Sequence, residues 1–166
     1  CVWIPKVLDD FSDEDPAIQY EELQSQWAVL VCGSRGWSNY RHEADVLNIY
    51  QILKECNYDD EHIILIANPD EIVNYGGNTP HDIRAEVGGR NLYNDVQLDY
   101  STDTIVPADI CNILLGKSSP HLPTVLNTDK HSNVLIYWTG HGEEDHFVWG
   151  NSWSKHFTSQ QLNDTF

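Results

Sequence analysis

Three unbroken runs of apolar residues constrain the fold of this 166-residue chain more than any other feature. They lie within residues 27–32, 62–67 and 133–138, of which only His62 and Asn133 are polar, and each run ends at residues typical of turns. A strand with one face in water alternates apolar and polar residues, whereas a strand covered on both faces is apolar along its length. The runs therefore predict three buried strands of a mainly parallel sheet covered by helices.

Helical patterns lie between and after these strands. Segment 39–56 repeats apolar residues at the spacing of one helix face, and segment 107–115 has a proline in its first turn and a glycine after its end. Thr158 can cap a last helix that continues to Phe166. The apolar face of the first helix consists of Val46, Ile49, Tyr50 and Leu53. Because strands and helices alternate along the chain, the predicted fold class is α/β.

The domain organisation follows from the same patterns. A chain of this length with 40% apolar residues suits one domain. Residues 1–25 hold seven acidic residues and two prolines, which predicts an acidic extended arm or pro-type segment before a folded domain at 26–166. Segment 68–106 is too long for a plain connection, so we expect it to pass over the carboxyl edge of the strands, where α/β proteins place their sites.

The charge of the chain limits its partners. A formal net charge of −17, from 26 acidic and 9 basic residues, repels phosphate backbones and anionic lipid headgroups. We therefore expect no nucleic-acid partner, and in the absence of about 18 consecutive apolar residues we expect no membrane span. The acid excess fits either a solvated surface or a field that attracts cationic substrates.

The four cysteines predict thiols rather than a metal centre. Cys1, Cys32, Cys56 and Cys111 show no C-x-x-C spacing and no histidine at zinc-ligand spacing. Cys32 and Cys111 lie in apolar stretches, which is typical of buried thiols. We expect no disulfide among Cys32, Cys56 and Cys111.

A histidine directly follows the third strand, in Thr139-Gly140-His141-Gly142. The strand end holds it at the carboxyl edge of the sheet, and the flanking glycines let the backbone approach a substrate. His141 is then placed to act as a general acid or base, with the N–H of Gly142 facing a developing oxyanion. Taken alone, the motif is explained equally well by a histidine that only fills a tight turn.

A second polar motif, residues 34–42, leaves the first strand at the same edge. Because neighbouring parallel strands end at one rim, we expect Asn39 to reach the ring of His141 and fix its tautomer. Arg41 and His42 offer donors that can hold a substrate carbonyl or carboxylate. The alternative for Arg41 and His42 is a helix N-terminus with solvated side chains.

Four blocks of sequence carry a family resemblance. Residues 27–32, 38–42, 95–100 and 132–142 resemble, in that order, the legumain (C13) family of cysteine peptidases, and within it most closely the branch of GPI-anchor transamidase catalytic subunits. Legumains carry an aspartate where Gly140 stands, which favours the transamidase branch or a related bacterial peptidase. The resemblance implies a caspase-like three-layer sandwich, of which this chain holds the N-terminal part.

The resemblance also assigns roles to individual residues. It implies that His141 is the catalytic histidine, that Gly142 supplies the oxyanion hole and that Asn39 supports the histidine. Arg41 and His42 match positions that line the pocket for the residue before the cleaved bond. In the family the nucleophilic cysteine closes the next buried strand after the histidine, and this sequence ends before that point. We expect either a fragment or processed chain whose nucleophile lies elsewhere, or a chain that is inactive by itself.

Cofactor, partners and compartment are also implied. The family needs no cofactor, although similar transamidases place acidic groups near Asp60 and Asp99, where oxygen ligands suit a structural calcium ion. The expected partners are a peptide or protein substrate and other subunits of a transamidase complex. The expected compartment is the secretory pathway, or the periplasm or exterior of a bacterium. The acidic run 143–145 either acts on His141 electrostatically or forms an exposed turn.

Two functions from different classes remain open. One is a thiol acyl-transfer enzyme, a peptidase or transamidase in which a cysteine attacks a peptide carbonyl and water or an amine resolves the acyl-enzyme. The other is a non-catalytic caspase-like module that binds partners, which the missing nucleophile favours.

Overall fold

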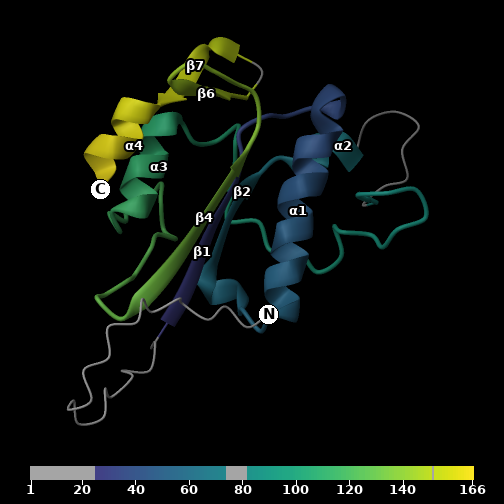
Figure 1. Ribbon diagram of the computed structural model, residues 1–166, viewed down its shortest axis with the longest axis horizontal. Helices are drawn as coiled ribbons and strands as arrows, with labels where there is room; N and C mark the ends of the chain where they lie inside the picture. Colours follow the sequence, from purple (N-terminus) through teal and green to yellow (C-terminus); the bar gives the residue numbers. More distant parts are fainter. Residues whose placement is uncertain (1–24, 74–81, 151) are drawn as a thin grey trace, which may run out of the picture.

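A computed structural model describes residues 25–73, 82–150 and 152–166 of the chain. Its centre is a sheet of four strands in the order β3-β2-β1-β4, all of them parallel (Figure 1). The strands are β1 (Ser25–Cys32), β2 (Ile63–Ala67), β3 (Tyr100–Ser101) and β4 (Ser132–Thr139). The three predicted strands are therefore confirmed as neighbours in one parallel sheet, while the arm predicted at 1–25 lies almost wholly outside the described residues.

Helices cover both faces of this sheet, which confirms the α/β class. Helix α1 (Tyr40–Glu55) follows the 3-10 turn η1 (Trp37–Asn39) and covers the face that carries Ala28 and Leu30. Helices α3 (Pro107–Leu114) and α4 (Ser159–Thr165) lie on the opposite side (Figure 1), where α3 packs against Val29 and Val31. The result is a three-layer arrangement with residues 27–32 of β1 buried at its centre.

The start of α4 shows how local sequence fixes an element. The Thr158 hydroxyl accepts a hydrogen bond from the N–H of Gln161 at 3.0 Å, and the Gln161 side chain accepts one from the N–H of Thr158 at 2.8 Å. This reciprocal pair satisfies two backbone donors that the first turn of a helix leaves open. The predicted cap at Thr158 is confirmed.

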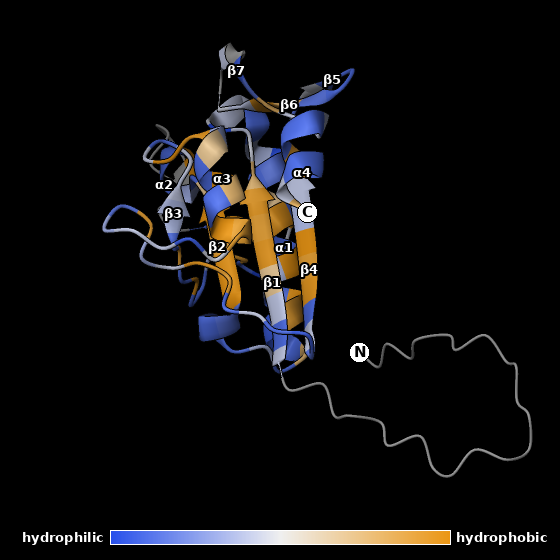
Figure 2. Ribbon diagram, turned by 90° about the vertical axis from the view of Figure 1, so that its left-hand side faces the viewer, coloured by the Kyte–Doolittle hydropathy of each residue, from blue (hydrophilic) through white to orange (hydrophobic). Residues whose placement is uncertain are grey.

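Strand β4 differs from its prediction. We expected a buried strand, but Val134, Leu135 and Ile136 are 40%, 41% and 38% exposed. Among the described strands β4 pairs only with β1, so it is an edge strand, and the helices do not cover its outer side. Figure 2 shows the hydrophobic colour running along β1, β2 and β4 alike, although only β4 leaves apolar side chains in contact with solvent.

A second, antiparallel sheet follows His141 and was not predicted. It contains β5 (Gly142–Glu143), β6 (His146–Trp149) and β7 (Ser152–Thr158). Trp138 at the end of β4 stacks against Phe147 and Phe157, which are cross-strand partners in this sheet, with ring centroids 5.0 Å apart in both pairs. This aromatic stack holds the small sheet against the carboxyl end of β4.

The remaining elements are short. They are the 3-10 turn η2 (Asp60–His62) and helix α2 (Pro69–Val73). We expected segment 68–106 to pass over the carboxyl edge of the sheet, but its part 82–99 packs beside α1, where Ile83 and Leu92 are buried and Gln51 donates to the Leu92 carbonyl at 3.0 Å. None of the helices in the described ranges is long and apolar enough to cross a membrane.

Candidate active site

His141 lies in the loop between β4 and β5, at the carboxyl end of the parallel sheet. Two hydrogen bonds fix its backbone: its N–H donates to the Ser34 hydroxyl at 3.2 Å, and its carbonyl accepts from the N–H of Val148 at 2.8 Å. The first bond joins His141 to the loop after β1 and the second joins it to the small sheet. The position of His141 is therefore fixed by the loop after β1 and by the small sheet.

Asn39 meets the ring of His141. Its Oδ1 lies 2.8 Å from Nε2 of His141, within hydrogen-bond distance, and its side chain is buried. Its Nδ2 donates to the carbonyl of Arg35 at 2.9 Å. Because that carbonyl can only accept, the amide is oriented with Oδ1 toward the histidine. The predicted convergence of Asn39 and His141 at one rim is confirmed, and their catalytic roles stay predictions.

The orientation of Asn39 determines which nitrogen of His141 carries the proton. An oxygen acceptor beside Nε2 requires a donor there, so the neutral ring is protonated on Nε2. Nδ1 is then the nitrogen that can take up a proton. A histidine held in this tautomer by a side-chain partner has the form of a catalytic base oriented by a third group.

The two residues predicted to bind substrate differ in their surroundings. Arg41 lies exposed in the first turn of α1 and donates to the carbonyl of Ser38 at 3.1 Å. His42 is 8% exposed, and its ring meets that of His141 edge-on with centroids 5.2 Å apart. Burial lowers the pKa of His42, helped by the charges of Arg41 and His141. The solvated-terminus alternative therefore fits Arg41 but not His42, which faces the candidate site as a neutral imidazole.

Gly142 and the acidic run that follows lie at the start of the small sheet. Gly142 pairs with Phe147, and a Cβ on Gly142 would approach the His146 carbonyl to 3.1 Å. Glu143, Glu144 and Asp145 are exposed, and Asp145 adopts φ 64° in the turn. The run therefore forms the exposed turn that we gave as its alternative. The oxyanion role of Gly142 stays a prediction.

Two residues in the loop after β1, Ser34 and Arg35, complete the site, although no role was predicted for either of them. Ser34 is 1% exposed, and its hydroxyl accepts the hydrogen bond from His141. Arg35 supplies the carbonyl that orients Asn39. Both lie inside the motif 34–42. Their position between the first strand and Asn39 is the one feature of the sequence that could have indicated their role in the site.

The described cysteines are free thiols with different surroundings. Cys32 is fully buried, as predicted, and its thiol donates to the carbonyl of Ser34 at 3.3 Å. Burial raises the pKa of Cys32 well above its usual value, and the carboxylate of Glu43 adds to the rise. A thiol of this kind is a poor nucleophile. Cys111 is half-buried on α3, less than predicted, and Cys56 follows the far end of α1.

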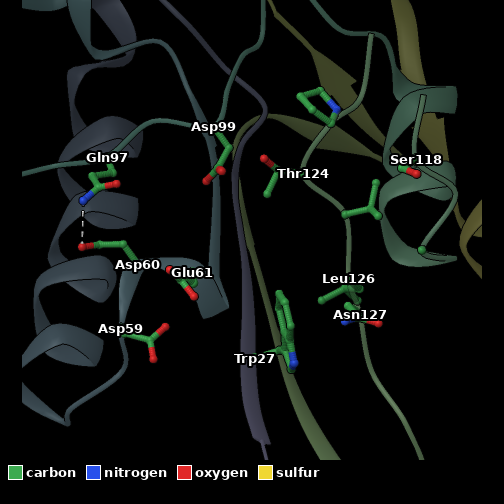
Figure 3. A pocket seen from close by; sticks show the side chains of 13 residues that line it. Trp27, Asp59, Asp60, Glu61, Gln97, Asp99, Ser118, Thr124, Leu126 and Asn127 are labelled. Atoms are coloured by element: carbon green, nitrogen blue, oxygen red, sulfur yellow. Dashed lines mark hydrogen bonds between the residues drawn. The ribbon is translucent and has the colours of Figure 1, made fainter. Parts of the chain in front are cut away.

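A cavity of about 1030 Å³ lies away from His141, at the amino end of the sheet (Figure 3). Its acidic lining comes from Asp59, Asp60, Glu61 and Asp99. Burial raises the pKa of Asp99, whose carboxylate accepts from the N–H of Leu65 at 2.9 Å. This cavity shares no residue with the candidate active site.

The expected calcium site falls in this cavity. Burial opposes ionisation of Asp60, but hydrogen bonds from Lys54, at 2.6 Å, and from Tyr50 outweigh it and lower its pKa. Gln97 also donates to the carboxylate at 3.0 Å, so the oxygens of Asp60 already serve protein donors. No group of three or more His, Cys, Asp or Glu side chains in the part of the chain that the structure describes is arranged to hold a metal ion. A calcium ion at Asp60 and Asp99 stays a prediction.

Comparisons with known proteins agree with the resemblance. The peptidase C13 family model matches residues 26–166. The GPI-anchor transamidases of Sus scrofa and Homo sapiens are each 34% identical over 159 residues, which are 92% of this chain and 40% of the relative. The vacuolar-processing enzyme beta-isozyme of Arabidopsis thaliana is 32% identical over 143 residues, which are 83% of this chain and 29% of the relative. The chain thus spans less than half the length of these relatives.

Proposed function

The chain belongs to the peptidase C13 family and has its caspase-like α/β fold, and from this premise we propose that it is the histidine-bearing part of a cysteine peptidase or transamidase. The substrate class is a peptide or protein. One observation carries the proposal: Asn39 holds the ring of His141 at the carboxyl rim of the sheet through a 2.8 Å hydrogen bond. A buried side chain that fixes the tautomer of a histidine has little use in a tight turn and a direct use in proton transfer.

The proposed reaction is acyl transfer through a thioester. A cysteine thiol gives its proton to Nδ1 of His141 while the sulfur attacks the carbonyl carbon of the scissile peptide bond. The imidazolium then returns the proton to the leaving amine, and the C–N bond breaks to leave the thioester. Water or an incoming amine attacks the thioester in the second half, and the same histidine takes its proton. The C–S bond then breaks to release the acyl product, and the histidine returns the proton to the sulfur. The N–H of Gly142 would stabilise the oxyanion in both halves.

The nucleophile of this proposal lies outside the described residues. Cys32 is buried with a raised pKa, and Cys56 and Cys111 lie on other elements. The proposed position of the nucleophilic cysteine is a strand next to the outer edge of β4, because β4 exposes apolar side chains and pairs only with β1 among the described strands. A further parallel strand of the same polypeptide on this edge would end at the rim that carries His141, as β1 and β4 do.

Substrate recognition is proposed for the start of α1. Arg41 presents an exposed guanidinium and His42 a neutral imidazole on the side of His141. Both side chains carry N–H groups that can donate, so they suit a carbonyl of the residue before the cleaved bond.

The non-catalytic alternative is a caspase-like interaction module. It is favoured by the surroundings of the described cysteines, of which Cys32, the one in β1, is buried. A tautomer-fixing bond to His141 would have no function in such a module. A cysteine at the end of the strand next to β4 in the full-length protein separates the two proposals.

The relatives bear on compartment and partners. GPI-anchor transamidases and a vacuolar-processing enzyme are its relatives, so we propose the lumen of the secretory pathway or a vacuole as its location. Other subunits of a transamidase complex are proposed partners. Whether water or an amine attacks the thioester depends on whether an amine can reach it. That access is a property of the whole protein.

The experiment compares this chain with the full-length protein. Both are assayed against peptides that carry asparagine or a small residue before the cut, with and without hydroxylamine as amine acceptor. We expect thiol-dependent turnover of the full-length protein and none of the 166-residue chain. Hydroxamate product indicates a transamidase, and hydrolysis alone indicates a peptidase. Turnover by the chain itself that a thiol reagent titrates would show that one of its own four cysteines is the nucleophile.

A further inference from the structure

Arg35 occupies a junction between three segments at the carboxyl rim of the sheet. Its guanidinium forms an ion pair with Glu71 of α2, with Nε 3.5 Å from the carboxylate, and a second ion pair with Asp103 in the loop after β3. Its main-chain carbonyl accepts the hydrogen bond from Nδ2 of Asn39 at 2.9 Å. The side chain thus joins the loop after β1 to helix α2 and to the loop after β3, while the backbone carbonyl of the same residue accepts the hydrogen bond from Asn39.

The partners of Arg35 are themselves held. The Asp103 carboxylate also accepts from Nδ2 of Asn68 at 2.8 Å, and the N–H of Asn68 donates to the buried carboxylate of Glu43 at 2.9 Å. Glu43 lies in the first turn of α1, four residues after Asn39. The ends of β1, β2 and β3 and the start of α1 are therefore joined by a chain of polar contacts in which Arg35 is the cation.

The orientation of Asn39 depends on the Arg35 carbonyl. An amide side chain can turn so that its oxygen and nitrogen exchange places, and only its partners decide between the two orientations. If the carbonyl of Arg35 moved away, the amide could turn and donate from Nδ2 to Nε2 of His141. That hydrogen bond would require the His141 tautomer that is protonated on Nδ1. That tautomer cannot take the proton of a thiol on the nitrogen proposed for it.

We propose that Arg35 is a positioning residue of the active site, because its ion pairs to Glu71 and Asp103 hold the carbonyl that orients Asn39 and, through Asn39, selects the tautomer of His141. Of the two tests of this inference, only the kinetic one rests on the proposed function. The hydrogen-bonding state of His141 can be measured without turnover.

The test uses full-length protein labelled with ¹⁵N-histidine. The imidazole ¹⁵N shifts of His141, assigned by their loss in His141→Ala, report which nitrogen carries the proton in the neutral ring. We expect Nε2 protonation in the unsubstituted protein, a shift toward mixed tautomers in Arg35→Ala, a smaller shift in Asp103→Asn, and recovery in Arg35→Lys. Arg90→Ala is the matched control, because Arg90 pairs with Glu55 on the surface of α1.

Kinetics supply the second arm. We expect kcat of Arg35→Ala to fall about tenfold or more with KM nearly unchanged, since small misplacements of catalytic groups cost rates of this order. Adding Arg35→Ala to Asn39→Ala should cause no further loss, because Arg35 acts through Asn39. Unchanged His141 shifts in a folded Arg35→Ala protein, or a full further loss in the double variant, would overturn the inference. If the unsubstituted protein shows no thiol-dependent turnover, the proposed function fails, while the ¹⁵N shifts still decide the role of Arg35.

Discussion

The side-chain oxygen of Asn39 lies 2.8 Å from Nε2 of His141, although 102 positions separate the two residues in the chain. The register of the sheet explains why Asn39 and His141 lie in contact. Strands β1 and β4 are parallel neighbours that pair without a shift from Ser25 and Ser132 to Cys32 and Thr139. The loops that follow them therefore leave the sheet at the same level, and each loop carries one of the two side chains.

The first prediction concerns the support that Asn39 gives. Replacing Asn39 by alanine removes the acceptor that fixes the tautomer of His141, so we expect kcat of the full-length protein to fall about 10- to 100-fold while KM changes little. The measurement is steady-state cleavage of a peptide substrate. Asn127→Ala is the control, because Asn127 is exposed at the acidic cavity and should leave the rate unchanged. Equal rates for Asn39→Ala and the unsubstituted protein would contradict the role of Asn39.

The second prediction concerns His141 itself. As proton carrier between the thiol and the leaving amine, His141 should contribute about 10³-fold to kcat, which corresponds to about 4 kcal/mol. His141→Ala should therefore abolish most turnover while binding of a peptide, followed by fluorescence anisotropy, survives. His156→Ala on β7 is the matched control, since His156 is an exposed residue of the small sheet. A parallel loss of binding and turnover would indicate that the variant disturbs the pocket rather than the proton transfer.

The strands and helices could be predicted because their signals are local. Periodicity and continuous apolar runs marked β1, β2, β4 and α1, and a single hydroxyl at Thr158 marked the start of α4. The meeting of Asn39 with His141 followed from one further rule, that parallel strands end at a common rim.

Other features depend on contacts that no local pattern records. Ile136 belongs to an apolar run like those of β1 and β2, yet it is exposed because β4 is at the edge of the described sheet. The small sheet escaped prediction because 142–158 mixes charged, polar and aromatic residues, and an irregularity at Val148 and Trp149 breaks the alternation of buried positions. The ion pairs of Arg35 join segments more than thirty residues apart, so the sequence alone could not reveal them.

The third prediction concerns recognition at the start of α1. Arg41 is exposed and outside the proton-transfer path, so a contact from it to the substrate acts in the ground state and the transition state alike. We expect Arg41→Ala to raise KM more than it lowers kcat, measured on peptides that differ only in the residue before the cut. Arg90→Ala controls for loss of a surface charge. A fall in kcat at constant KM would place Arg41 in the chemical step instead.

The last prediction concerns the effect of Glu43, a carboxyl group four residues after Asn39, on the pH dependence of stability. Glu43 is fully buried in the first turn of α1, and burial raises its pKa to about 7 from the ordinary 4.5, although the hydrogen bond from the N–H of Asn68 acts in the opposite direction. Between these two pH values the folded protein keeps a proton on Glu43 that the unfolded chain has released. The free energy of unfolding should therefore fall as pH rises from 4.5 to 7, and Glu43 should add no further pH dependence above that window.

Glu43→Gln isolates this effect, because glutamine keeps the oxygen that accepts from Asn68 and cannot ionise. We expect the unsubstituted protein to lose about 3 kcal/mol relative to Glu43→Gln across the window, measured by urea unfolding of the full-length protein at half-unit steps of pH. Glu86→Gln serves as control, since Glu86 is exposed and its replacement should leave the pH profile parallel to that of the unsubstituted protein. If the profiles of Glu43→Gln and the unsubstituted protein also run parallel from pH 4.5 to 7, Glu43 binds its proton equally well in the folded and the unfolded protein, and burial does not raise its pKa.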